Sequence, residues 1–137
     1  MASANGETVS TTDGSSDDLT TVLGLMSVRA RRTLTLDGLI GDWKRFVGEV
    51  ERGYSLTVYD YTNDLGTRRQ LAEVINEVTP EVAREIEARL AQFDDRFRNA
   101  TRPSSTPVGG GSQSQEEWWM FRIPWRLRGE LKSDLGL

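Results

Sequence analysis

Three stripes of apolar residues at helical spacing occupy the middle of this chain, and they restrict its fold more than any other feature. Between residues 36 and 50 the apolar positions recur every three or four residues, as in an amphipathic helix with one buried face. A second stripe ends at Val78, and a third extends from Val82 to Phe97. Sequential helices with short connections pack as antiparallel neighbours. The sequence therefore predicts an all-α fold in which residues 35–100 form a small three-helix bundle.

Residues with known positional preferences mark the ends of the first and third helices. Thr33 or Thr35 is suited to cap the first helix, because its hydroxyl can accept a hydrogen bond from a free backbone amide. Gly53 is suited to end that helix, since glycine adopts the left-handed conformation at little cost. The run Thr-Pro-Glu at residues 79–81 supplies a cap, a proline and an acid in the order that a helix start favours. We therefore expect the third helix to begin at residue 80.

Residues 54–66 combine two patterns. The first of them alternate between apolar and polar side chains, as in a strand. No second strand of similar strength is predicted, and a single strand is not stable alone. We therefore predict a helix over residues 56–78 with Ser55 as its cap. A break in this helix near Asn63 or Gly66 is the alternative.

The regions that flank the bundle differ from it in composition. Residues 1–34 begin with a run rich in Ser, Thr, Gly and Asp, and we expect a largely disordered acidic tail with a short helix as an alternative for its second half. Residues 101–115 are rich in Pro, Ser and Gly and are predicted to be a flexible linker. Residues 116–137 begin with aromatic and basic side chains and end with leucines at every fourth position, which predict a short C-terminal helix.

The aromatic segment, which we define as residues 118–128, carries large apolar side chains that must be buried against another surface. It contains three of the four tryptophans of the chain, interleaved with arginines. Such a cluster packs on its own bundle or on a second copy, docks into another protein, or inserts into a membrane surface. A bundle as small as residues 35–100 buries little apolar surface and gains from an extra layer. We therefore favour packing on the bundle of the chain itself or of a second copy.

The composition excludes several classes of function. The chain has 137 residues with no cysteine and no histidine, which excludes disulfides, cysteine-bound zinc and nucleophiles activated by histidine. It carries 17 Lys and Arg against 21 Asp and Glu, a balance that argues against a nucleic-acid partner. We expect no metal and no cofactor. The chain has no apolar run of the roughly 20 residues needed to span a bilayer and no secretory signal pattern, so we expect a cytoplasmic protein.

Charged and aromatic residues of the predicted second helix form a candidate surface. Asp60, Asp64 and Arg68 share one helical face. They form either a carboxylate site for a metal-dependent enzyme or, as we favour, a surface ladder with an ion pair between Asp64 and Arg68. Tyr59 faces away from the apolar stripe and is predicted to be exposed, whereas two other tyrosines belong to the core. The alternating charges of residues 81–98 are interpreted as a solvated helix face.

These observations predict a non-catalytic, acidic protein that binds another protein as an adaptor, regulator or inhibitor. A toxin-neutralising immunity protein or antitoxin is one specific version, and a second copy of the chain is an alternative partner. A peripheral membrane protein anchored by the aromatic segment is the first alternative function, and an enzyme that uses a metal at Asp60 and Asp64 is the second. The residues predicted to bind the partner are Tyr59, Asp60, Asp64, Trp118, Trp119, Phe121, Arg122 and Trp125.

Overall fold

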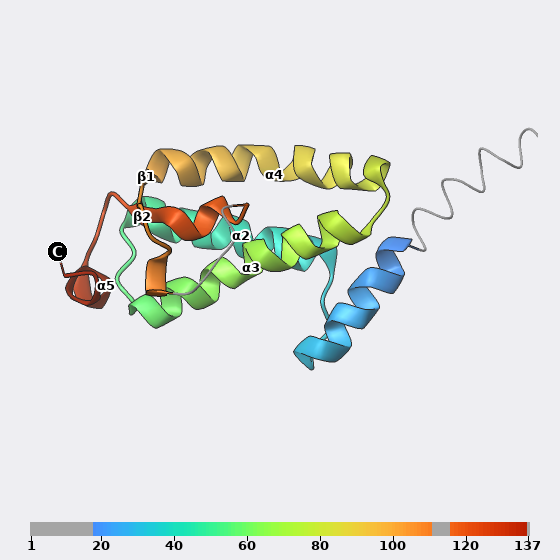
Figure 1. The fold of residues 1–137 in the computed structure, drawn as a ribbon, viewed down its shortest axis with the longest axis horizontal. Helices are drawn as coiled ribbons and strands as arrows, with labels where there is room; N and C mark the ends of the chain where they lie inside the picture. Colours follow the sequence, from blue (N-terminus) through green and yellow to red (C-terminus); the bar gives the residue numbers. More distant parts are fainter. Residues whose placement is uncertain (1–17, 111–115, 137) are drawn as a thin grey trace, which may run out of the picture.

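The computed structural model of this protein describes residues 18–110 and 116–136, and these are mostly helical (Figure 1). The all-α prediction is therefore confirmed. The predictions for residues 1–17 and 111–115 lie outside the described residues. The elements in chain order are a helix at residues 18–30, α2 (Leu36–Arg52), α3 (Val58–Glu77), α4 (Pro80–Ala100), β1 (Thr101–Pro103), the 3-10 turn η1 (Val108–Gly110), the 3-10 turn η2 (Trp118–Phe121), β2 (Arg122–Pro124) and α5 (Gly129–Asp134).

Helix α2 begins and ends at residues that its sequence indicates. The hydroxyl of Thr35, rather than that of Thr33, accepts a hydrogen bond from the amide of Gly38 at 3.0 Å. The helix ends at Gly53, whose φ of +107° is a conformation that other residues rarely adopt. Its amide donates back to the carbonyl of Val50. Local capping chemistry therefore determines both ends.

Helix α3 begins later than predicted and is continuous. Thr57, not Ser55, is its cap, and the first helical residue is Val58. The Thr57 hydroxyl accepts from the amide of Asp60 at 3.0 Å, while the Asp60 carboxylate accepts from the Thr57 hydroxyl and amide. This reciprocal capping box requires an acid three residues after the cap, which Ser55 does not have. The helix then continues to residue 77 without the alternative break.

Helix α4 begins at Pro80 as predicted, but Thr79 does not cap it through its side chain. Instead, the amide of Thr79 donates to the carboxylate of Asp18 at 3.0 Å. This contact ties the start of α4 to the helix at residues 18–30, the helical alternative for that segment. Met26 of the same helix is only 4% exposed and belongs to the hydrophobic core.

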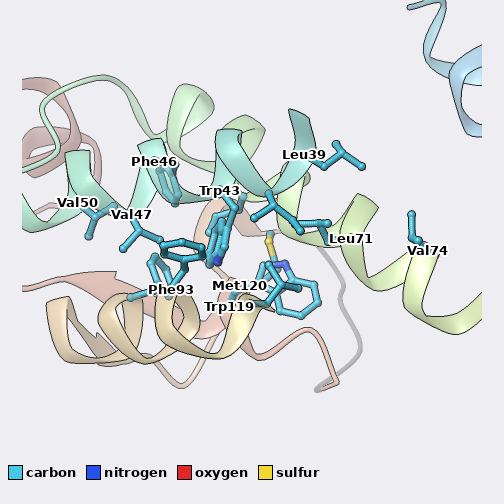
Figure 2. Close-up of a cluster of buried hydrophobic side chains, with 14 of the residues drawn as sticks. Leu39, Trp43, Phe46, Val47, Val50, Leu71, Val74, Phe93, Trp119 and Met120 are labelled. Carbon is cyan, nitrogen blue, oxygen red and sulfur yellow. The ribbon is translucent and has the colours of Figure 1, made fainter. Parts of the chain in front are cut away.

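The core lies between α2 and the two helices that flank it. Helix α2 contacts both α3 and α4 more extensively than these two contact each other. Figure 2 shows side chains of α2, such as Trp43 and Val47, directed toward Phe93 of α4. Trp119 and Met120 of the aromatic segment belong to the same cluster (Figure 2). The bundle is thus completed by a segment far from it in sequence.

Two short strands connect the aromatic segment to the end of α4. β1 and β2 pair antiparallel, with Thr101 opposite Pro124 and Pro103 opposite Arg122. The first part of the predicted linker is therefore a strand, and η1 within the same segment contacts α3. Figure 1 shows β1, β2 and α5 at one end of the bundle and the helix at residues 18–30, in blue, at the other. None of the helices within the described ranges is long and apolar enough to cross a membrane.

Candidate functional site

The inner part of the aromatic segment, residues 118–121, packs against the bundle. The turn η2 contacts α3, and the ring of Trp118 lies 6.0 Å from that of Phe97 on α4. Trp119 and Met120 are 3% and 5% exposed. Trp118 and Phe121 are partly buried against the same core. Trp119, which we predicted to bind a partner, is therefore covered by its own chain.

A buried ion pair lies beneath this inner part. Arg68 of α3 binds the carboxylate of Asp94 on α4 through Nε and Nη2, both at 3.0 Å. The indole Nε1 of Trp43 donates to the same carboxylate at 2.9 Å, so Asp94 accepts three hydrogen bonds. The Arg68 guanidinium lies 4.8 Å from the ring centroid of Trp119, over its face. The network therefore connects all three helices of the bundle to the aromatic segment.

Two predictions about charged residues were wrong because they ignored this pair. Arg68 is 7% exposed and does not pair with Asp64 as we predicted. Asp94 is 8% exposed, although we assigned it to a solvated face. A carboxylate that is bound twice by a guanidinium and once by an indole can be buried, since its hydrogen-bonding needs are met. In the described chain, Arg68 Nη1 and Trp119 Nε1 have no hydrogen-bond acceptor.

Asp60 and Asp64 are each engaged in local structure. Asp60 closes the capping box of α3. Asp64 accepts a hydrogen bond of 2.6 Å from the hydroxyl of Tyr54. Burial and this carboxylate raise the pKa of Tyr54 well above its ordinary value of 10.0. Within residues 18–110 and 116–136, no group of three or more acidic, histidine or cysteine side chains could hold a metal ion.

The three tyrosines differ in exposure, as predicted. Tyr59 is 76% exposed, whereas Tyr54 and Tyr61 are buried. The hydroxyl of Tyr61 donates to the backbone oxygen of Arg122 at 2.9 Å, and burial raises the pKa of Tyr61. Tyr59 lines a shallow depression between α3 and η1, together with Arg69 of α3. Tyr59 is thus available to a partner, while Tyr61 holds β2 onto the bundle.

Arg122 stabilises the end of α4. Its Nε donates to the hydroxyl of Thr101 at 2.7 Å, and its Nη2 donates to the carbonyls of Arg98 and Thr101 at 3.1 and 3.0 Å. A cation at this position satisfies carbonyls that a helix C-terminus leaves unpaired. Burial, together with the nearby charge of Arg98, lowers the pKa of Arg122. Most donors of this predicted partner-binding residue are therefore used inside the chain.

In the outer part of the aromatic segment, residues 125–128, every side chain is exposed except that of Leu127, which is partly buried against the core. Trp125 is 64% exposed, and the Arg102 guanidinium lies 5.9 Å from its ring centroid. Trp125 and Arg126 line a groove between the last turns of α2 and α4. Sequence reasoning grouped Trp125 with the other tryptophans and missed Arg102. The pairing of β1 with β2 brings Arg102 and Trp125 together, and no local pattern in the sequence reveals that register.

Trp118 and Trp125, although both partly accessible, contact arginines in different ways. The guanidinium of Arg98 lies 3.9 Å from the ring centroid of Trp118 and also contacts the carboxylate of Asp95 at 3.3 Å. Among the described residues, no carboxylate forms an ion pair with Arg102. The positive charge beside Trp125 is therefore the less compensated of the two.

The comparisons give no family or function for this arrangement. No protein-family model, no curated protein and no solved structure matches the chain.

Proposed function

We propose that this chain is a non-catalytic protein that binds another protein through the outer part of its aromatic segment. The observation that carries the proposal is Trp125, which is 64% exposed beside two arginines, while Trp119 in the same segment is 3% exposed. Tryptophan and arginine are among the residue types that contribute most binding energy at protein interfaces. An adaptor, a regulator or an inhibitor, including one of the immunity or antitoxin type, would use such a surface.

The polar groups of the chain support a binding role over a catalytic one. Neither histidine nor cysteine occurs in the sequence. The chain therefore lacks the imidazole that most often serves in acid–base catalysis and the thiol of a cysteine nucleophile. The carboxylates of Asp60 and Asp64 take part in a helix cap and in a hydrogen bond with Tyr54. Both contacts stabilise the fold and leave these groups less available for chemistry.

Affinity capture with matched variants tests the proposal. The full chain is immobilised as wild type, as Trp125→Ala and as Tyr59→Ala, a control that removes a similarly exposed aromatic side chain. We expect a host protein that the wild type and the control retain and that Trp125→Ala loses. Circular dichroism of all three proteins establishes that they are folded.

Two results would contradict the proposal. Loss of the captured protein with Tyr59→Ala alone would move the binding surface to the exposed face of α3. Failure of the wild type to retain any protein above a column carrying an unrelated acidic protein would argue against protein binding.

A further inference from the structure

The groove beside Trp125 has the size and lining of a site for a few side chains. It has a volume of about 240 Å³, and its apolar surface comes from Ala100 and Trp125, since Val50 beneath them is fully buried. Pockets for drug-sized ligands and cofactors are larger, at roughly 300–1,000 Å³. The exposed indole of Trp125 forms one wall. The groove therefore suits one apolar side chain of a partner segment better than a small molecule.

Positive charge exceeds negative charge around this groove. The carboxylate of Glu51 is bound by Arg96 through two hydrogen bonds of 2.9 and 2.6 Å. This pairing lowers the pKa of Glu51 and raises that of Arg96, so the two charges largely offset each other. Arg102 and Arg126 have no ion pair in the part of the chain that the structure describes. The groove therefore has one unpaired positive charge in its lining, that of Arg126, and a second beside its Trp125 wall, that of Arg102.

Helix dipoles do not account for these two arginines. Cations near a helix C-terminus are favourable, and Arg122 meets that need for α4 through the carbonyls of Arg98 and Thr101. Arg102 lies in β1, and Arg126 follows β2, so both lie beyond the last turns of the bundle helices. Arg126 is exposed and Arg102 is partly exposed, on a chain whose net charge is −4. Local charge of the opposite sign to that of the whole protein indicates complementarity to an acidic ligand.

We infer that this groove binds an extended acidic segment of a partner protein. An apolar side chain of that segment sits against Trp125, and flanking carboxylates pair with Arg102 and Arg126. The inference rests on the proposed protein-binding function and adds the chemistry of the partner. A membrane surface is the competing ligand, but Trp118 and Trp119 pack on the bundle, which leaves a single tryptophan of the aromatic segment largely exposed for insertion.

Fluorescence anisotropy with a defined peptide tests the inference. The probe is a labelled peptide of about ten residues, made of glutamate and aspartate around a central leucine. The control probe replaces each acid with its amide. We expect the full-length protein to bind the acidic peptide at least about tenfold more tightly than the neutral one, a difference of about 1.4 kcal/mol. Added salt should weaken this binding, since the contacts are exposed charges.

Variants place the binding on the groove. Arg102→Gln/Arg126→Gln should weaken binding of the acidic peptide about tenfold, while Arg31→Gln/Arg32→Gln removes the same charge from the exposed end of the helix at residues 18–30 and should change it less than twofold. Equal losses in both variants, or equal binding of the two probes, would overturn the inference. Binding to vesicles that contain phosphatidylserine, without binding to the peptide, would also overturn it in favour of a lipid surface.

The outcomes separate this inference from the proposed function. Suppose that the captured host protein is lost with Trp125→Ala and retained by Arg102→Gln/Arg126→Gln. This result would support protein binding and would contradict an acidic segment as the ligand of the groove. Suppose instead that the acidic peptide binds the groove and no host protein is captured. This result would support the preference of the groove for an acidic ligand and would contradict the proposed binding of a host protein.

Discussion

Trp119 and Trp125 belong to the same aromatic segment, yet they occupy opposite environments. Trp119 is 3% exposed and packs over the Arg68–Asp94 pair, whereas Trp125 is 64% exposed beside Arg102. The inner part meets a surface formed by α3 and α4. The outer part lies at the last turns of α2 and α4, where it lines a shallow groove. Composition alone therefore does not determine whether an aromatic side chain is buried, because burial requires another surface of the protein to pack against it.

The largest expected effect comes from removing the inner anchor. Trp119→Ala deletes a side chain that is packed in the core, and we expect a loss of about 3–5 kcal/mol of unfolding free energy. Urea titration followed by far-ultraviolet circular dichroism measures it. Should the variant fail to fold, Trp119→Phe provides a milder test, with an expected loss smaller than that of the alanine variant. A loss below about 1 kcal/mol in Trp119→Ala would show that the inner part is not part of the core.

Removing the charge beneath the inner part should have the second largest effect. Asp94→Asn keeps the shape of the side chain but leaves the Arg68 guanidinium buried without its counterion. We expect a loss of about 2–3 kcal/mol, measured by the same urea titration. The control is Asp95→Asn. The Asp95 side chain is exposed, and its ion pair with Arg98, at 3.3 Å, lies on the surface. Equal stability of the two variants would mean that Arg68 reaches solvent when its partner is neutral.

Alkaline pH tests the boundary between the two parts, which Tyr61 holds through Arg122. Burial raises the pKa of Tyr61 above the value of 10.0 that applies when it is exposed. Above pH 10 the unfolded chain loses this proton before the folded chain does. Stability is therefore complete below about pH 10 and falls above it, by on the order of 1 kcal/mol from this residue at about pH 11. Tyr54, whose pKa is also raised, adds to the loss.

Urea titrations at several pH values measure this effect, with Tyr61→Phe as the matched variant. The variant lacks the ionisable hydroxyl, so its stability should fall less steeply above pH 10 than that of the wild type. Identical profiles for the two proteins would show that Tyr61 ionises without unfolding and does not fasten β2.

The smallest expected effect on stability is that of the outer part. Trp125→Ala removes a mostly exposed side chain and should change the unfolding free energy by about 0.5 kcal/mol or less. The same variant should abolish partner capture, so its effect on binding exceeds its effect on folding. A stability loss comparable to that of Trp119→Ala would remove the distinction between the two parts of the segment.

Features that depend on near neighbours in sequence were predictable. The amphipathic stripes indicated α2, α3 and α4, and Pro80 indicated where α4 begins. The exposure of Tyr59 followed from its helical phase. The cap of α3 was misassigned to Ser55, although the sequence carries the signal for Thr57 in the acid three residues later.

Features that depend on distant residues were not predictable. Arg68 and Asp94 lie on different helices, and each looked like a surface charge in its own helix. Arg102 meets Trp125 only because β1 and β2 pair in a particular register. Short strands that carry prolines and charges have little sequence signal. The candidate site was therefore only partly visible, since Trp125 was named but its basic surroundings were not.

The sequence by itself determined the helical class, the start of α4 at Pro80 and the presence of an aromatic segment that must be buried against another surface. These properties follow from periodicity, capping and composition, which act over a few residues. Only the tertiary structure decided which aromatic side chains are covered and which charges are buried together. Burial depends on the surfaces that folding brings face to face, and an ion pair such as Arg68–Asp94 is stable inside a protein only when its geometry is good and further hydrogen bonds, such as that from Trp43, offset the cost of burial.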